Sequence, residues 1–120
     1  MSDTIYLDNQ ATTQIDPEVI DAMMPYFYNK FGNASSIHHS YGRESKKAVE
    51  RSRQILADSI KAKKREIVFT SGATEAINLA IKGVAGTFKK KHHMISQATE
   101  HNAVLDTFRS IEKKGWDISI

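Results

Sequence analysis

The chain has 120 residues with a formal net charge of +3, and 40% of the residues are hydrophobic and 26% charged. This balance fits a folded domain with one hydrophobic core and excludes a fully disordered chain. No apolar run approaches the ~20 residues of a membrane-spanning helix and no signal-peptide pattern opens the sequence, so we expect a cytoplasmic protein with no membrane partner. The absence of cysteine excludes disulfides, thiolate metal sites and thiol nucleophiles within these residues.

The basic residues gather in three short clusters, within residues 61–65, 89–91 and 113–114. Each cluster comes where a helical pattern ends, and a cation at a helix C-terminus is stabilised by the helix dipole by about 0.3–1 kcal/mol. A nucleic-acid-binding surface would instead place its cations along one face. The clusters therefore favour solvated helix ends over a nucleic-acid partner.

The first predicted helix begins at Asp16, Pro17 and Glu18. This order places an N-cap aspartate first, then proline at the first helical position and an acidic residue in the first turn. Apolar residues then recur at helical spacing and predict a helix over residues 17–30. Pro25 is expected to kink this helix or to loosen one of its turns, because proline has no amide hydrogen to donate.

A second, longer helix is predicted to begin at His38 or His39 and to end at Ala62. It follows a loop over residues 31–36 that is rich in Gly, Asn and Ser. Gly42 is expected to weaken its first turn, because glycine loses more backbone freedom than other residues. The helical repeat predicts a packed stripe at Ala48, Ser52, Ile55, Leu56, Ser59 and Ile60.

The second half of the chain alternates between strand and helix patterns. Strand, helix, strand, helix and strand in this order are typical of the opening of a parallel sheet with right-handed crossovers. We therefore predict an α/β fold for this half. The predicted elements are strands at 66–70, 93–96 and 116–120, and helices at 73–88, packed through Ile77, Ala80, Ile81 and Val84, and at 102–114, packed through Val104, Leu105, Phe108 and Ile111.

A candidate phosphate cradle lies where the strand over 66–70 passes into the next helix. Gly72 permits a tight turn there, and the first-turn amides of Ala73, Thr74 and Glu75 have no partners inside the helix and lie at the positive end of its dipole. With the Thr74 hydroxyl they form donors suited to a phosphate. The alternative is simple capping by Ser71 or Thr70. A Walker loop is excluded, because no Gly-Lys-Ser/Thr follows.

His101 is the second candidate site residue. It lies just past the carboxyl end of the second predicted strand, at the start of the next helix. Ligands in open α/β sheets bind beyond the carboxyl ends of the strands, so parallel strands would place His101 and the cradle on one rim. An imidazole there can stack on an aromatic ring or donate a hydrogen bond. The alternative is a solvated or capping histidine.

The five histidines raise the question of a metal site. His38 and His39 are adjacent, so their side chains point in different directions on a helix. No carboxylate completes a set of ligands with them at a telling spacing. We expect no bound metal.

Four stretches of the sequence together resemble cysteine desulfurases of the NifS/IscS type, within the class V aminotransferase family. The second of them also favours this group over the other main desulfurase group, although Ala34 stands where the family usually has proline. The stretches are Tyr-Leu-Asp-Asn to Ala-Thr-Thr over 6–13, Gly-Asn-Ala-Ser-Ser-Ile-His over 32–38 with Gly42, Glu-Ile-Val-Phe-Thr-Ser-Gly-Ala-Thr-Glu over 66–75 with Asn78, and Thr-Glu-His-Asn-Ala-Val-Leu over 99–105.

The resemblance implies a truncated type I pyridoxal-phosphate-enzyme fold, with N-terminal helices followed by the first βαβαβ part of a mostly parallel sheet. Residues 1–62 would form the small-domain and dimer-contact part, and residues 63–120 the start of the large cofactor-binding domain. Ala73 and Thr74 would bind the phosphate of pyridoxal 5′-phosphate. His101 would stack on the pyridine ring and take part in proton transfers, which makes it the expected catalytic residue.

The activity implied is sulfur transfer from L-cysteine, which becomes L-alanine, for iron–sulfur cluster assembly or tRNA thiolation. Family members use a Schiff-base lysine, an aspartate and a mobile cysteine. The family pattern places all three beyond residue 120, so we expect this chain alone to be inactive. The expected partners are a second copy in a homodimer or a complementing C-terminal chain, and a sulfur-acceptor scaffold protein.

Two alternatives remain at this point. One is a non-catalytic interaction module that docks on a full-length desulfurase. The other is a part of a different class V enzyme, such as a selenocysteine lyase. The residues after 120 would decide between cysteine and selenocysteine, and the sulfur acceptor is not encoded in these stretches.

Overall fold

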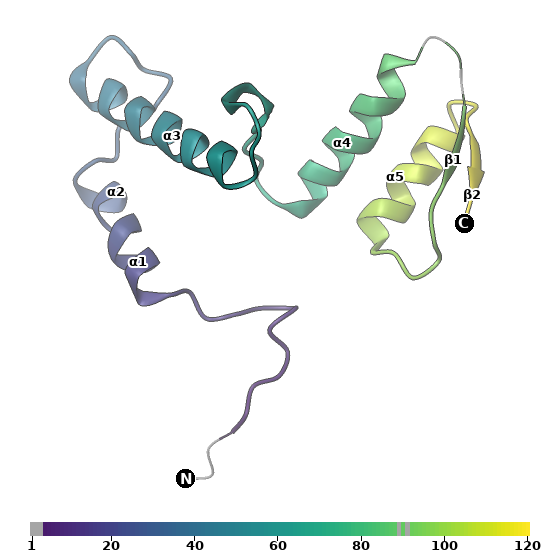
Figure 1. Cartoon of the computed structure of the whole chain (residues 1–120), viewed down its shortest axis with the longest axis horizontal. Helices are drawn as coiled ribbons and strands as arrows, with labels where there is room; N and C mark the ends of the chain where they lie inside the picture. The colour runs from purple at the N-terminus through teal and green to yellow at the C-terminus, as the bar shows by residue number, and fades with distance from the viewer. Residues whose placement is uncertain (1–3, 89, 91) are drawn as a thin grey trace. The chain divides into compact units, whose positions relative to one another are not determined.

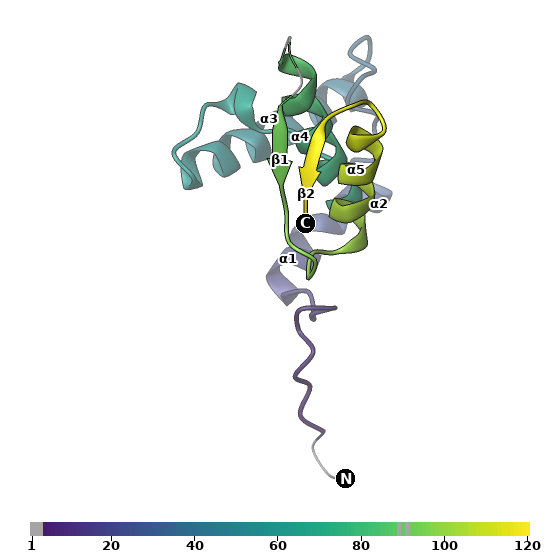
Figure 2. The ribbon, with the colours of Figure 1, turned by 90° about the vertical axis from the view of Figure 1, so that its right-hand side faces the viewer.

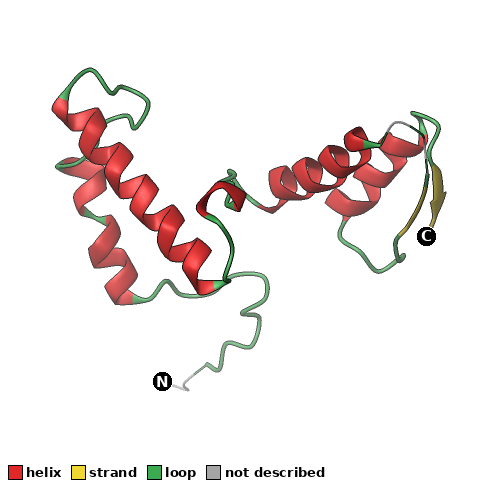
Figure 3. Ribbon diagram, turned by 45° about the horizontal axis from the view of Figure 1, so that its top comes forward, coloured by secondary structure: helices red, strands yellow, loops and turns green. Residues whose placement is uncertain are grey.

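A computed structural model of the chain describes residues 4–88, 90 and 92–120. The chain divides into two compact units, Met1–Ile67 and Val68–Ile120, and each is described by itself. Helices make up most of the regular structure in both units, and the second unit also holds a small sheet (Figures 1 and 3). In the part of the chain that the structure describes, no helix has the length and apolar character that crossing a bilayer requires.

The predicted helix over residues 17–30 is present as two short helices, α1 (Pro17–Met23) and α2 (Pro25–Tyr28). The Asp16 carboxylate accepts a hydrogen bond from the Glu18 amide at 2.8 Å, which confirms the predicted N-cap. The helix is interrupted before Pro25 because proline cannot donate to the preceding turn. The predicted kink is thus confirmed as a break between two helices.

The long helix of the first unit is α3 (Ser40–Ser59), and a short 3₁₀ helix, η1 (Lys64–Glu66), follows it. His39 caps α3, since its Nδ1 accepts a hydrogen bond from the Gly42 amide at 3.2 Å. The helix ends before the predicted Ala62. Lys61 takes a left-handed conformation with φ of 56°, which turns the chain out of the helix.

The packed stripe predicted on α3 is wrong for its larger residues. Ile55, Leu56 and Ile60 are 57%, 46% and 67% exposed, whereas Gly42 and Ala57 are buried. The Ser45 hydroxyl in the first half of α3 donates to the Lys30 carbonyl, and η1 packs on α3 with Lys64 paired to Glu50 at its middle. Within the described residues of this unit, no other helix packs on α3, so much of its apolar face stays exposed.

The second unit contains α4 (Ala73–Thr87), β1 (His93–Ile95), α5 (Asn102–Glu112) and β2 (Asp117–Ser119). The two strands run parallel, as Figure 2 shows, with Met94 opposite Ile118 in the register. The predicted parallel crossover is confirmed. Helix α5 contacts both α4 and β2. Phe108 and Ile111 are buried at the centre of this unit, which confirms the predicted packed side of α5.

The packed side predicted for α4 is confirmed only in part. Ile77 and Ile81 are half-buried, but Ala80 and Val84 are exposed. Asn78 and Ala85 are half-buried in their place, so the contact face of α4 is turned by about one residue from the predicted one. A helix face is set by what packs against it, and here that neighbour is α5.

The strand predicted over residues 66–70 is not formed. Glu66 belongs to η1, and residues 67–70 have no regular structure. Val68 and Phe69 are 62% and 46% exposed rather than buried. A strand is stable only when its amide and carbonyl groups pair with a neighbour, and among the described residues only β1 and β2 pair. The predicted βαβαβ order is therefore present as α4 followed by β1, α5 and β2.

The boundary between the two compact units falls after Ile67, whereas the predicted domain boundary falls after residue 62. The segment between them contains η1, which packs on α3 and so belongs with the first unit. The assignment of residues 1–62 to a small domain and of 63–120 to a large cofactor-binding domain stays a prediction.

Candidate functional site

The first turn of α4 presents free backbone donors. Among the described residues, no acceptor lies within hydrogen-bond reach of the Ala73 and Thr74 amides, and the first bond of this helix runs from the Ala76 amide to the Gly72 carbonyl at 3.1 Å. Both residues are exposed. The helix dipole places partial positive charge at this point, so the turn is suited to an anion.

The capping alternative for this turn is not what the structure shows. The amide and the hydroxyl of Ser71 both donate to Glu75 Oε2, at 2.6 and 2.7 Å. The Thr70 hydroxyl donates to the Gly72 carbonyl at 3.3 Å. Neither side chain therefore caps the amides of Ala73 or Thr74.

The carboxylate of Glu75 is held back from the same amides. The backbone hydrogen bond from Ser71, followed by the bond from its hydroxyl, lowers the pKa of Glu75 below its ordinary value. The group is thus ionised at neutral pH and bonded to the residue before the turn. An anion at the Ala73 and Thr74 amides does not have to displace it.

His101 is the N-cap of α5. Its Nδ1 accepts a hydrogen bond from the Ala103 amide at 3.1 Å, and its side chain is exposed. The capping interpretation of this histidine is therefore correct. The cap involves only Nδ1 of the ring, and Nε2 makes no hydrogen bond with any residue in the described ranges.

The structure brings the two predicted site segments to the same end of one helix pair. Helices α4 and α5 pack against each other, and Figures 1 and 3 show their N-terminal ends on the same side. Ala73 begins α4 and His101 immediately precedes α5. Among the described residues, no hydrogen bond or ring contact joins His101 to Ala73 or Thr74. The shared edge predicted for these residues is therefore formed by the N-terminal ends of α4 and α5, and not by the carboxyl end of a strand over residues 66–70.

The other two stretches of the predicted site lie in the first unit. In residues 32–38 the Asn33 side chain accepts from the Ser35 amide at 2.9 Å, and the Ile37 carbonyl accepts from Arg43 at 3.2 Å. These bonds fold the loop onto the first turns of α3. Near the N-terminus the Tyr6 hydroxyl lies 2.6 Å from Thr12 Oγ1 and closes a local turn. The family resemblance implies that residues 11–13 and 33–38 lie near the active-site entrance or the dimer contact, and this stays a prediction.

The histidines do not gather into a metal site in the described ranges, where no three His, Cys, Asp or Glu side chains could hold one ion. His93 is instead paired across the sheet, with Nε2 2.8 Å from Ser119 Oγ. His39 and His101 use Nδ1 as helix caps.

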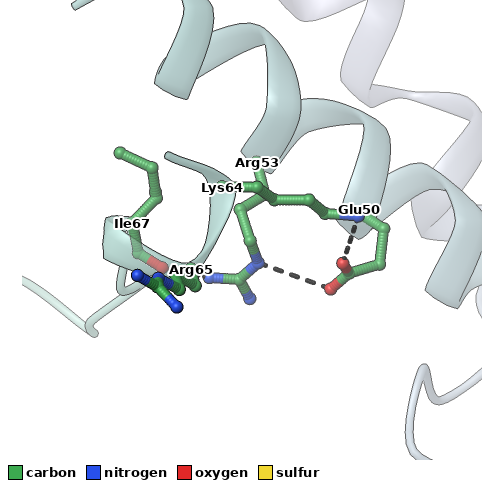
Figure 4. A pocket seen from close by; sticks show the side chains of 5 residues that line it. All are labelled: Glu50, Arg53, Lys64, Arg65 and Ile67. Atoms are coloured by element: carbon green, nitrogen blue, oxygen red, sulfur yellow. Dashed lines mark hydrogen bonds and ion pairs between the residues drawn. The ribbon is translucent and has the colours of Figure 1, made fainter. Parts of the chain in front are cut away.

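One ionic cluster was not predicted from the sequence. It lines an open pocket on the first unit, where Glu50 bridges Lys64 at 2.7 Å and Arg53 at 3.4 Å (Figure 4). Arg53 also donates to the Ile67 carbonyl. The hydrogen bond from Lys64 is the largest cause of a pKa of Glu50 below its ordinary value. The cluster ties η1 to α3, and the i, i+3 spacing of Glu50 and Arg53 was its only local signal.

Residues 5–120 match the family described as Aminotransferase class-V. The chain belongs to the class-V aminotransferase family. This match covers both the free first turn of α4 and the capping histidine of α5, so both lie within the part of the chain that the family defines.

Two relatives of this class-V aminotransferase chain are cysteine desulfurases. It is 53% identical to the cysteine desulfurase of Homo sapiens over 116 residues, which are 96% of this chain and 25% of that protein. It is also 53% identical to the cysteine desulfurase IscS of Rickettsia massiliae, covering 96% of this chain and 28% of that protein. The chain thus spans about a quarter of the length of these relatives. The predicted resemblance to the NifS/IscS type is confirmed.

A solved structure titled "SspA in complex with cysteine" shares the fold. It is 37% identical to this class-V aminotransferase chain, with a TM-score of 0.85 over 97% of this chain and 33% of that one. The predicted fold class, an incomplete part of the type I pyridoxal-phosphate-enzyme fold, is confirmed, although the first predicted strand is not formed.

Proposed function

We propose that this chain is the N-terminal quarter of a pyridoxal-phosphate-dependent cysteine desulfurase. In this proposal the first turn of α4 binds the cofactor phosphate and His101 faces the cofactor ring. The observation that carries it is the pair of free amides at Ala73 and Thr74, at the end of the α4–α5 pair where His101 lies. The relatives named as cysteine desulfurases support desulfuration of cysteine as the reaction at that site.

The donors of the first turn fit a dianionic phosphate. The Ala73 and Thr74 amides have no other acceptor in the described residues, and the Thr74 hydroxyl adds a third donor. A hydrogen bond to a charged group contributes about 1.5–3 kcal/mol, and the helix dipole adds to it. The bond between Ser71 and Glu75 keeps a negative carboxylate away from the phosphate.

Bound pyridoxal phosphate supplies an electron sink for bonds at the α-carbon of an amino acid. The residues of this chain bind its phosphate and present an imidazole beside it. A cysteine nucleophile is absent from the 120 residues. The lysines that the structure describes lie on or after helices rather than at a strand end. In this proposal both reacting groups lie outside the 120 residues, and the chain alone is inactive.

L-cysteine is the proposed substrate of the whole enzyme, and L-alanine and a transferable sulfur are its products. The solved neighbour titled as a complex with cysteine supports this choice. A cytoplasmic homodimer that passes sulfur to an acceptor scaffold stays part of the proposal. The docking-module alternative is not favoured, because the family match extends over residues 5–120 and the phosphate donors are free.

The test is a chimera in which residues 5–120 replace the matched quarter of the human relative. We expect it to bind pyridoxal phosphate and to form alanine from L-cysteine, with the transferred sulfur released as sulfide when a thiol reductant is added to the assay. Thr74→Ala removes one donor and should raise the cofactor dissociation constant roughly ten- to a hundred-fold. His101→Ala should lower turnover more than cofactor retention, because its role is exerted during the reaction.

The matched control for Thr74→Ala is Thr87→Ala, at the other end of α4. The Thr87 hydroxyl donates to the Val84 carbonyl at 2.7 Å and lies far along the helix from the free amides. Thr87→Ala should leave the cofactor dissociation constant unchanged. Equal cofactor binding by the two variants, or a folded chimera that forms no alanine, would overturn the proposed function.

A further inference from the structure

We propose that the C-terminal ends of α4 and α5 form a binding site for single-stranded nucleic acid. Three aromatic rings meet at this end of the second unit, and lysines lie next to them along the chain. The site goes beyond the proposed function and does not depend on it, because the Ala73 and Thr74 amides lie at the opposite end of α4.

The ring cluster consists of Phe88, His92 and Trp116, which belong to three different segments. Phe88 directly follows α4, His92 precedes β1 and Trp116 precedes β2. The ring centroid of Phe88 lies 5.0 Å from that of His92 and 6.1 Å from that of Trp116, and the other two centroids are 6.0 Å apart. Figures 1 and 2 both show the end of α4, the start of β1 and the turn between α5 and β2 at one end of this unit.

The rings of this cluster offer open aromatic surface. Their planes are inclined to one another by 59° to 76°, so no two of them are stacked face to face. Phe88 is 51% exposed and His92 is exposed, whereas Trp116 is half-buried and anchors the cluster. Proteins that bind single strands stack the bases on such open rings, and stacking accepts any base because every base has an aromatic face.

Lysines lie close to all three rings along the chain. Lys90 lies between the first two rings, and Lys113 and Lys114 follow α5 directly, just before the third. All three are exposed, and within the described ranges none of their ammonium groups is in an ion pair. Lys89 and Lys91 lie outside the described residues. Ammonium groups without a carboxylate partner are available to the phosphates of a nucleic-acid backbone.

The nearby carboxylates decide which kind of anionic partner fits. Glu112 and Asp117 belong to the same stretch as two of the lysines and are also exposed. The three lysines and these two carboxylates together leave only a small net positive charge, so charge alone attracts a polyanion weakly. Much of the binding must then come from the rings. A single strand uses both lysines and rings through its phosphates and bases, whereas an acidic protein segment uses the lysines alone.

The ring cluster could not be predicted from the sequence. Taken one cluster at a time, the lysines are typical of solvated helix ends, and Lys113 and Lys114 do lie at the end of α5, where the helix dipole stabilises cations. Phe88 and Trp116 are far apart along the chain and meet only because α4 packs on α5. This meeting of rings beside lysines is what points to a nucleic acid.

Trp116 makes binding directly measurable, because it is the only tryptophan of the chain. Its fluorescence is followed while an oligouridine of about 12 nucleotides is added to the folded 120-residue chain, and the anisotropy of a label on the oligonucleotide gives the dissociation constant. We expect oligouridine to quench Trp116. Oligodeoxythymidine of the same length should do so too, since stacking uses the base and not the sugar. An RNA duplex should bind more weakly, because its bases are already stacked on one another.

The lysine contribution is tested with a double variant, Lys113→Ala with Lys114→Ala. It should weaken oligouridine binding about ten-fold and lower the slope of log K against log salt by about 1.4, since each phosphate contact to a single strand contributes roughly 0.7. The matched control is Lys46→Ala with Lys47→Ala, which removes the same charge from an exposed pair on α3 in the first unit. The control should stay within about two-fold of the wild-type dissociation constant.

The ring contribution is tested with Phe88→Ala, which should weaken binding about ten-fold. Its control is Phe27→Ala, at an exposed phenylalanine of α2, which should not change binding. Unchanged Trp116 fluorescence on addition of oligouridine overturns the proposal, whether or not the Phe88→Ala variant folds. Equal losses in the two lysine double variants, or duplex binding as tight as that of the single strand, also overturn it. Displacement of oligouridine by polyglutamate at equal charge concentration would indicate an acidic protein partner instead.

Discussion

The close contact between the loop over 32–38 and the first turn of α3 predicts that Gly42→Ala is destabilising. A Cβ atom on Gly42 would lie 1.9 Å from the Ser36 carbonyl oxygen, and 2.8 Å from that of Asn33. Both are backbone atoms, so no side-chain rotation relieves the overlap. Real Cβ contacts are essentially never shorter than 3.0 Å, so the loop must move by about 1 Å or the first turn must open.

Two opposing terms set the magnitude. Alanine gains about 1 kcal/mol over glycine in helix propensity. Moving the loop weakens two interactions. The hydrogen bond from the Gly42 amide to His39 contributes about 1 kcal/mol, and the contact between the Phe31 and Tyr41 rings contributes about 0.5–1.5 kcal/mol. Unrelieved overlap adds about 1–3 kcal/mol. The expected net loss is on the order of 2 kcal/mol, or roughly 10 °C in melting temperature for a unit of this size.

Gly83→Ala and Gly86→Ala are matched controls within α4, because a Cβ at either position meets nothing within 4 Å. We expect each control to be neutral or to stabilise by up to about 1 kcal/mol. The measurements are thermal unfolding by circular dichroism and limited proteolysis of the loop over 32–38, which Gly42→Ala should accelerate. A Gly42→Ala chain that melts at or above the wild-type temperature would refute the reasoning from close contact.

Three further predictions concern the ends of α3 and the cofactor. Lys61→Gly should stabilise the chain by about 1 kcal/mol in urea unfolding, because a left-handed conformation strains any residue with a Cβ; a lower stability would contradict this. Lys64→Ala should raise the pKa of Glu50 toward 4.5 in an NMR titration, and no change would exclude Lys64 as the main cause. Since the pKa of Glu50 is lowered in the folded chain, its stabilising contribution is present above its ordinary pKa and is lost as the pH falls through the folded value. The chain alone, treated with pyridoxal phosphate and borohydride, should show no single labelled lysine by mass spectrometry; one uniquely labelled lysine would contradict the proposed absence of an anchor.

The candidate site could be predicted from the sequence because its hydrogen-bonding groups depend on residues that are close together along the chain. Ala73 and Thr74 follow a glycine at a helix start, and the loss of amide partners there is a property of every helix N-terminus. His101 was found by the same kind of signal. Its use as a cap through Nδ1 was one of two alternatives, and only the position of the Ala103 amide decided it. The common end of α4 and α5 also required the packing of the two helices.

The sequence by itself determined the α-helices and their order along the chain. Helical hydrogen bonds join residues four apart, so the Asp16 cap and the break before Pro25 depend on neighbours along the chain. The tertiary structure decided everything that requires a distant partner. Residues 67–70 carry a β-branched and aromatic run and remain irregular, whereas residues 93–95 and 117–119 become strands because α5 returns the chain beside β1. An amphipathic pattern states which face of a helix is apolar, but only a packed neighbour buries it.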